Sequence, residues 1–244
     1  MTDSMQADRR WKYPLTPFQI RRDFERPDPA LVARLAGVDI TTLSDLVGRM
    51  YTVDTSIRSL YGPALPMVGV ATTVKVPPGD NLGVMKALSL VAPGDIIVID
   101  GQGFTQWCLG GFQMLEYSKR EFGLQGALVN GAYRDVGEAQ AAGFPLYGKG
   151  VSPHSGPKVG PGEINVPVCV GGVIVHPGDV IAASGEGVVV VPRMALDRVA
   201  RQVSPARPAP PSAADPDAGI KGFLDEMEIH VSRFYESGRG IYLD

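Results

Sequence analysis

Short apolar runs rich in valine and isoleucine alternate with stretches of helical period in the part of the chain before Gly148. The runs predict buried strands of the parallel type, and the stretches between them predict helices with one apolar face. The expected strands are 68–76, 96–100, 126–130 and 146–147, and the expected helices are 29–35, 40–47, 82–90, 109–122 and 135–142. Strands that alternate with helices are typical of an α/β fold.

The pattern changes after Gly148, where strands and turns follow one another without a helix. Strands are expected at 164–170, 173–175, 180–183 and 188–192, and a closing helix is expected at 194–203. This part of the chain therefore predicts a compact layer of β-structure.

The two ends of the chain differ from the middle. Residues 1–26 are charged and aromatic without a clear period, and we interpret them as an N-terminal arm that packs on the body or on a neighbouring subunit. Residues 204–217 are rich in proline and alanine, which favours a semi-rigid linker. Within 218–244 a last amphipathic helix is expected at 220–235. We therefore expect one compact domain at 27–203.

Composition narrows the class of protein. The 244 residues are 44% hydrophobic and 20% charged, with a net charge of -3, which is ordinary for a globular chain. No lysine- or arginine-rich block is present, which argues against nucleic-acid binding. No apolar stretch has the length of a membrane span, and the polar N-terminus argues against a signal peptide. We expect a cytoplasmic protein without a membrane partner, and two free thiols at Cys108 and Cys169.

Arg134 and Asp135 lie side by side where the strand 126–130 gives way to the helix 135–142. Loops at the carboxyl ends of strands are open to ligands while the sheet holds them in place. An arginine there can bind a carboxylate through two parallel hydrogen bonds, and an aspartate can hold a divalent metal through oxygen. The alternative is an aspartate N-cap beside a solvated arginine, and these two residues alone favour that alternative.

The glycine-rich segment 101–111 makes a second turn of this kind, after the strand that ends at Asp100. Backbone N–H groups at the start of the following helix can bind an anion, although an ordinary strand-to-helix turn has the same sequence features. Because successive turns of a parallel sheet open on the same edge, one anionic ligand could reach both the amides near Phe112 and the guanidinium of Arg134.

Other catalytic patterns are incomplete. The glycines at 101 and 103 lack the third glycine of a dinucleotide fingerprint, and the segment 143–149 lacks the Ser or Thr of a phosphate loop. The three histidines are scattered without zinc-site spacing, and no serine-hydrolase elbow is present. The loop 150–162, which carries His154 and Lys158, is either a mobile connection or a lid over a site.

Several strings of residues resemble the RraA-like family, in order and with sensible spacing over the region 43–196. They are Pro93–Asp95 with Val98–Asp100, Gly126–Asp135, Asn165–Val168, Gly171–Val173, Pro177–Asp179 and Gly187–Pro192. The family includes metal-dependent 4-hydroxy-4-methyl-2-oxoglutarate aldolases and a catalytically silent regulator of ribonuclease E. The resemblance implies a three-layer β/β/α sandwich of the swivelling-domain type, and homotrimers or homohexamers with sites between subunits.

The resemblance also implies roles for individual residues. Asp135 would bind Mg²⁺ or Mn²⁺, and Arg134 would bind the pyruvyl part of a small 2-oxo acid. The start of the helix, at Phe112, Gln113, Met114 and Leu115, would contact the substrate. The family aldolases usually carry a glycine followed by an acid before the arginine. Counting back without gaps gives Phe112-Gln113 here, and shifting the frame gives Gly110-Gly111, so neither alignment supplies the carboxylate. As a catalytic residue, Gln113 would hold a water by a hydrogen bond, but it cannot act as a base at neutral pH. Glu186 is the remaining carboxylate before the final strand, and it would serve a neighbouring subunit's metal site.

These features favour a lyase that releases pyruvate through an enolate, by retro-aldol cleavage or by decarboxylation of oxaloacetate. A metal and an arginine beside the developing enolate oxygen both stabilise its charge. One alternative is a non-catalytic binding protein like the ribonuclease regulator, because the acid at Gln113 is missing. Another is a related lyase or hydratase that uses His154 or Lys158 as acid or base.

Overall fold

The computed structural model describes residues 18–203 and, nearer the C-terminus, residues 224, 227–229, 231–233 and 236–237. The chain divides into two compact units, Met1–Val203 and Ser204–Asp244. The expected last helix falls in the second unit, where its described residues are largely helical, while Phe223 and His230 lie outside the described residues. No helix among the residues that the structure describes is long and apolar enough to cross a membrane.

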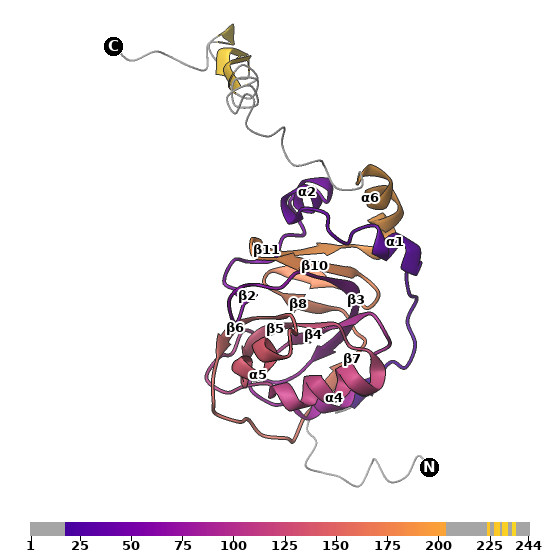
Figure 1. Cartoon of the computed structure of the whole chain (residues 1–244), viewed down its shortest axis with the longest axis vertical. Helices are drawn as coiled ribbons and strands as arrows, with labels where there is room; N and C mark the ends of the chain where they lie inside the picture. The colour runs from indigo at the N-terminus through magenta and orange to yellow at the C-terminus, as the bar shows by residue number, and fades with distance from the viewer. Residues whose placement is uncertain (1–17, 204–223, 225–226, 230, 234–235, 238–244) are drawn as a thin grey trace, which may run out of the picture. The chain divides into compact units, whose positions relative to one another are not determined.

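Four parallel strands form the middle of a nine-stranded sheet (Figure 1). They are β3 (Met67–Lys75), β4 (Asp95–Asp100), β5 (Gly126–Tyr133) and β6 (Leu146–Val151). The connections between them carry α3 (Leu82–Ala87), α4 (Phe112–Phe122) and α5 (Val136–Ala141). Every residue of β4 and β5 is buried, which agrees with the continuous apolar runs in their sequences.

Shorter strands complete the sheet. β7 (Gly162–Ile164) pairs with β3 and with β1 (Phe18–Ile20), and β2 (Arg58–Ser59) pairs with β6. β10 (Val180–Ser184) pairs antiparallel with β3 and with β11 (Gly187–Val191). β8 (Val168–Val170) and β9 (Val173–Val175) form a separate two-stranded sheet.

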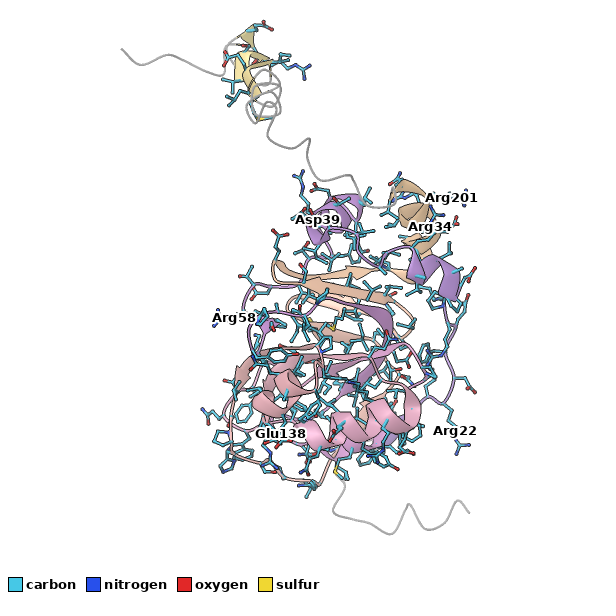
Figure 2. All side chains as sticks on the ribbon, viewed as in Figure 1. Arg22, Arg34, Asp39, Arg58, Glu138 and Arg201 are labelled. Carbon is cyan, nitrogen blue, oxygen red and sulfur yellow. The ribbon has the colours of Figure 1, made fainter. Side chains whose placement is uncertain are left out.

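Three hydrophobic clusters hold these elements in layers. Alternate residues of β4 point to opposite faces, so Ile97 and Ile99 pack under α3 and α4 whereas Ile96 and Val98 pack against β8 and β9. Side chains fill both spaces (Figure 2). The result is the expected three-layer β/β/α sandwich. A third cluster lies between β10 and β11 and the helices α1 (Pro29–Ala33), α2 (Ile40–Leu46) and α6 (Leu196–Gln202), which follows the short 3-10 helix Arg193–Ala195.

The N-terminal segment is joined to the body by an ion pair between a partly exposed arginine and a buried aspartate. Arg26 donates to both carboxylate oxygens of Asp95, at 2.5 and 2.9 Å, and Asp95 is fully buried. The Asp95 carboxylate also accepts from Thr72 Oγ1 at 2.7 Å and from the N–H of Ala92 at 2.8 Å. Residues 18–26 of the expected arm thus contact the same unit as the sheet.

Several element boundaries differ from expectation. β5 continues three residues beyond Asn130, since Gly131 lets Leu109 and Phe104 pack where a side chain would stand. The expected strand 164–170 is two strands, because Asn165 adopts a left-handed backbone with φ 56 and turns the chain from one sheet into the other. α4 begins at Phe112 rather than Leu109, whose N–H instead bonds Ala132 O beside β5.

Candidate functional site

The two strand-to-helix turns meet, as the sequence predicts. The N–H of Arg134 donates to Gly110 O at 3.1 Å, and the N–H of Leu109 donates to Ala132 O at 2.9 Å. At Gly111, an added Cβ would overlap the Asp135 carboxylate and lie 3.2 Å from Arg134 Nε. Glycine at this position therefore lets the Asp135 side chain approach the backbone at the start of α4.

Asp135 does not act as a helix cap. It occupies the N-cap position of α5, but its side chain makes no capping hydrogen bond, and its backbone is left-handed with φ 61 and ψ 34. A non-glycine residue in this region is uncommon and is often found at functional sites. The carboxylate is 34% exposed and its ion-pair partner is Arg134 Nε at 3.6 Å. The carboxylate therefore keeps free lone pairs, and the alternative interpretation of Asp135 as a cap is wrong.

The guanidinium of Arg134 has donors to spare. Its Nε is buried without a hydrogen-bond partner, and Nη1 reaches Pro153 O at 3.5 Å, the outer limit of a hydrogen bond. The side chain is 40% exposed, so a ligand can approach it. Since a guanidinium carries five N–H donors in a planar fork, this side chain is suited to a carboxylate.

Tyr133 lies behind this pair, and the sequence analysis did not single it out. Its ring occupies the space that a side chain at Gly110 would need, and its hydroxyl is buried without a hydrogen-bond partner. Burial raises the pKa of the phenol, and the thiol of Cys108 and the carboxylate of Asp135 raise it further. The hydroxyl is therefore protonated at neutral pH. Its position next to Arg134 is the only sequence signal that could have identified it.

The loop 150–162 lies against the site and is tied to it at several points. Ser152 Oγ donates to Gln106 O at 2.6 Å, and the N–H of Cys108 donates to His154 O at 2.8 Å. Further along, Asp80 accepts from the N–H groups of Val159 and Gly160 at 2.8 and 3.0 Å. These bonds hold the loop to the body of the protein near both of its ends. Lys158, within the loop, is exposed.

Asn81 borders the same loop and was also not identified from the sequence. Its N–H donates to Pro157 O at 3.2 Å. Its side chain is buried, makes no capping bond to α3, and leaves Oδ1 without a partner. An orphaned buried acceptor is costly in a fold, so Oδ1 is a further group that a bound ligand or water can satisfy.

The expected substrate contacts at the start of α4 are of two kinds. Phe112 and Leu115 are buried in the core, where Phe112 packs against Phe144 at 5.7 Å between ring centroids. Only the backbone of these two residues can face a ligand. Gln113 and Met114 line an apolar groove of about 310 Å³ between α3 and α4.

Glu186 is not brought to Arg134 and Asp135 within one chain. It lies in the turn between β10 and β11, where Ala183 pairs with Met67, the first residue of β3. Arg134 and Asp135 instead follow the last residue of β5. Because β3, β4 and β5 run parallel, Glu186 lies at the amino ends of these strands, and Arg134 and Asp135 lie at their carboxyl ends.

The donor set for a metal is correspondingly small. Within the described part of the chain, no three His, Cys, Asp or Glu side chains come together in a way that could hold a metal ion. Asp135 offers one partly exposed carboxylate in the space that Gly111 leaves open. One carboxylate with remaining positions for water and substrate suits Mg²⁺, which usually keeps several waters, so Asp135 fits such an ion.

Comparison with known proteins agrees with this fold. A family model for RraA-like proteins, described as Aldolase/RraA, matches residues 39–190. A protein of Halalkalibacterium halodurans named "Putative 4-hydroxy-4-methyl-2-oxoglutarate aldolase" is 32% identical over 205 residues, which cover 82% of this chain and 96% of the relative.

Two solved structures are similar as well. Streptomyces coelicolor RraAS2, an unusual member of the RNase ES inhibitor RraA family, superposes with a TM-score of 0.66 at 26% identity, over 86% of this chain and 99% of that one. The RNA-processing inhibitor RraA of Thermus gives a TM-score of 0.57 at 29% identity, over 64% and 93%. The family model covers more than half of the chain, and the chain therefore belongs to the RraA-like family.

Proposed function

We propose that this protein is a divalent-metal-dependent lyase that cleaves a carbon–carbon bond beside a small 2-oxo acid and releases pyruvate. The substrate would be of the 4-hydroxy-4-methyl-2-oxoglutarate type, or oxaloacetate. The observation that carries the proposal is the Arg134–Asp135 pair, held against Gly111 with its donors and acceptors largely free. The name of the Halalkalibacterium relative supports it.

The chemistry requires stabilisation of an enolate. When the bond between C3 and C4 breaks, its electron pair moves onto the pyruvyl fragment and negative charge develops at the C2 oxygen. Arg134 would donate N–H groups to the substrate carboxylate and to this oxygen, and backbone N–H groups at the start of α4 point the same way. Asp135 would hold Mg²⁺ or Mn²⁺, which when bound supplies further positive charge beside the enolate.

Proton transfers complete the reaction. In a retro-aldol cleavage the C4 hydroxyl loses its proton as a carbonyl forms, and the enolate takes up a proton at C3 to give pyruvate. The Gln113 amide cannot accept the proton of the C4 hydroxyl at neutral pH. The neutral phenol of Tyr133, which precedes the pair and packs against Gly110, would be the proton donor, and His154 and Lys158 in the loop 150–162 are the alternative acid–base groups.

The test is pyruvate release from both substrates with Mg²⁺ or Mn²⁺. Arg134→Ala should lower turnover about 10²- to 10³-fold, as loss of a preorganised oxyanion donor does, and Asp135→Ala should abolish both the activity and the binding of Mn²⁺. Arg120→Ala is a matched control, since Arg120 is an exposed arginine on α4 that pairs with Glu121. Full activity of Asp135→Ala, or of the wild type in excess chelator, would refute the metal role.

We further propose that the protein forms a homotrimer or homohexamer and that Glu186 from a neighbouring subunit completes the metal site. Within one chain Glu186 lies at the opposite ends of the strands from Asp135, so only the Glu186 of a neighbouring subunit could reach this site. Asp135→Ala and Glu186→Ala should each be inactive alone, yet mixing them in one oligomer should restore part of the activity. No restoration, or full activity of Glu186→Ala alone, would remove Glu186 from the neighbour's site.

A second candidate function is a non-catalytic regulator. It is favoured by Gln113, which stands where the family aldolases carry an acid, and by the inhibitor descriptions of the two structural relatives. Oxalate, a mimic of the pyruvate enolate, distinguishes the two functions. A lyase site should bind it with Mg²⁺ and raise the melting temperature. Absence of any shift, together with inhibition of an E-type ribonuclease, would favour the regulator.

A further inference from the structure

An exposed aromatic pair lies at the edge of the candidate site. The rings of Trp107 and His154 stack with centroids 5.3 Å apart and planes 22° apart. Trp107 is 37% exposed and His154 is exposed. We call these two residues the aromatic rim. Trp107 has no role in the proposed enolate chemistry, and His154 is only one of its alternative acid–base groups, so the exposed surface of the pair calls for an explanation.

The aromatic rim is linked to Arg134 through backbone contacts on both sides. Trp107 precedes Cys108, whose N–H donates to His154 O at 2.8 Å. Pro153, which precedes His154, supplies the carbonyl that Arg134 Nη1 reaches at 3.5 Å. His154 is thus the neighbour in sequence of Pro153, which contacts the guanidinium. Trp107 is the neighbour of Cys108, which leads into the Gly110–Gly111 turn.

The rim is held in place by its surroundings. The edge of Phe104 packs against Trp107 at 5.7 Å and 83°. A Cβ at Gly79 would clash with the indole, so glycine allows the turn 77–80 to close against it. The bond from Ser152 Oγ to Gln106 O, at 2.6 Å, fixes the two segments that carry the rings. A rigid aromatic surface with few rotatable bonds contacts a ligand at low entropic cost.

We propose that the aromatic rim is the specificity wall of the site and selects 2-oxo acids whose far end is aromatic or otherwise flat and apolar. This inference rests on the proposed lyase function, because Arg134 and Asp135 would hold the pyruvyl end. The preferred reaction is then retro-aldol cleavage of 4-hydroxy-2-oxo-4-phenylbutanoate. The C3–C4 bond breaks, the C4 hydroxyl loses a proton to give benzaldehyde, and C3 gains a proton to give pyruvate.

The physical reason is complementarity. An indole and an imidazole offer stacking surface to a phenyl group, and offset or edge-to-face aromatic contacts stabilise such a pair beyond the area buried. A second carboxylate, as in 4-hydroxy-4-methyl-2-oxoglutarate, would lose water against the indole ring and meet no positive charge there, with a single N–H as its donor. The wall therefore discriminates between two substrates that share the same reacting end.

Fluorescence of Trp107 provides a direct test. The chain has two tryptophans, Trp11 and Trp107, so Trp11→Phe leaves Trp107 as the single reporter. With Mg²⁺ present, phenylpyruvate should change the Trp107 emission and bind on the order of tenfold more tightly than pyruvate, which lacks the ring. Emission that responds equally to both ligands at equal affinity would overturn the proposal.

Catalysis gives the second readout. Trp107→Leu should lower kcat/KM for 4-hydroxy-2-oxo-4-phenylbutanoate about tenfold and leave kcat/KM for 4-hydroxy-4-methyl-2-oxoglutarate within about twofold. Trp107→Phe should restore most of the loss, and Met194→Leu, a change at a side chain that is 94% exposed, should change neither. The wild type could instead prefer the dicarboxylate, with the same preference in Trp107→Leu. That result would refute the specificity wall but not the proposed lyase function.

Two further outcomes are decisive. If neither oxalate nor pyruvate binds with Mg²⁺ and no pyruvate is released from any substrate, the lyase proposal itself fails and the wall fails with it. If the emission of Trp107 without ligand shifts as the protein is diluted across its oligomer dissociation, the rim is buried between copies of the chain and is not a substrate wall.

Discussion

Gly111→Ala tests the geometry of the site without disturbing the core. Gly111 is the N-cap residue of α4, with φ -117, a backbone conformation that alanine adopts freely. An added Cβ would nevertheless lie well inside 3.0 Å of Asp135 Oδ2, a distance that real Cβ atoms essentially never show. Ordinary contact begins at 3.4 Å, so the carboxylate must move. The shift needed is on the order of 1 Å, a displacement that can cost about 10²-fold in rate.

The expected stability change is small, because the atom that must move is the end of a partly exposed side chain. Alanine is a poorer N-cap than glycine, which should lower the free energy of unfolding by less than about 1 kcal/mol. For a unit of this size that corresponds to a melting temperature lower by about 2–4 °C or less. Turnover and the affinity for Mn²⁺ should both fall, while the far-ultraviolet circular dichroism should be unchanged.

Gly137→Ala is the matched control. Gly137 lies in α5, two residues after Asp135, and an added Cβ there meets nothing within 4 Å. Because alanine is favoured over glycine in helices, this variant should be as active as the wild type and more stable by about 0.5–1 kcal/mol. Unchanged pyruvate release and Mn²⁺ affinity in Gly111→Ala would show that Asp135 does not work from its position against Gly111.

Other predictions follow from buried polar groups. Arg26→Ala should lower the free energy of unfolding by about 1.5–3 kcal/mol in urea titrations, since the buried Asp95 carboxylate would keep its bonds from Thr72 and Ala92 but lose the charge-assisted bonds from Arg26; Arg26→Ala with Asp95→Asn should recover much of that loss. Tyr133→Phe removes an unpartnered hydroxyl and should raise the free energy of unfolding by about 1 kcal/mol, whereas a fall in turnover would identify the phenol as the proton donor. Burial raises the pKa of Tyr147 from 10.0 to about 12. The folded state thus favours the neutral phenol. The contribution of this preference to the free energy of unfolding is complete below pH 10 and is lost as the pH rises towards 12. The urea midpoint of Tyr147→Phe should therefore fall less than that of the wild type over this range.

The sequence by itself determined the central strands β3 to β6 and the helices between them, but not the short edge strands β1 and β2. Whether a residue such as Ile97 or Ile96 faces the helices or the β layer depends on a period of two along one strand, which is a local property. The meeting of the two glycine-rich turns was predictable for the same reason, because parallel strands place their carboxyl ends at one edge. The position of Arg134 and Asp135 therefore followed from the sequence.

Tertiary structure decided what those residues contact. Asp135 has the sequence position of a helix cap, yet its left-handed backbone places the carboxylate against Gly111. Pro153, which reaches Arg134, and Trp107, which stacks on His154, come from separate segments. Glu186 lies at the far edge because β10 runs antiparallel to β3. Such contacts join segments distant along the chain, and their geometry is set by packing and by glycines that leave room for a neighbour, neither of which a local pattern encodes.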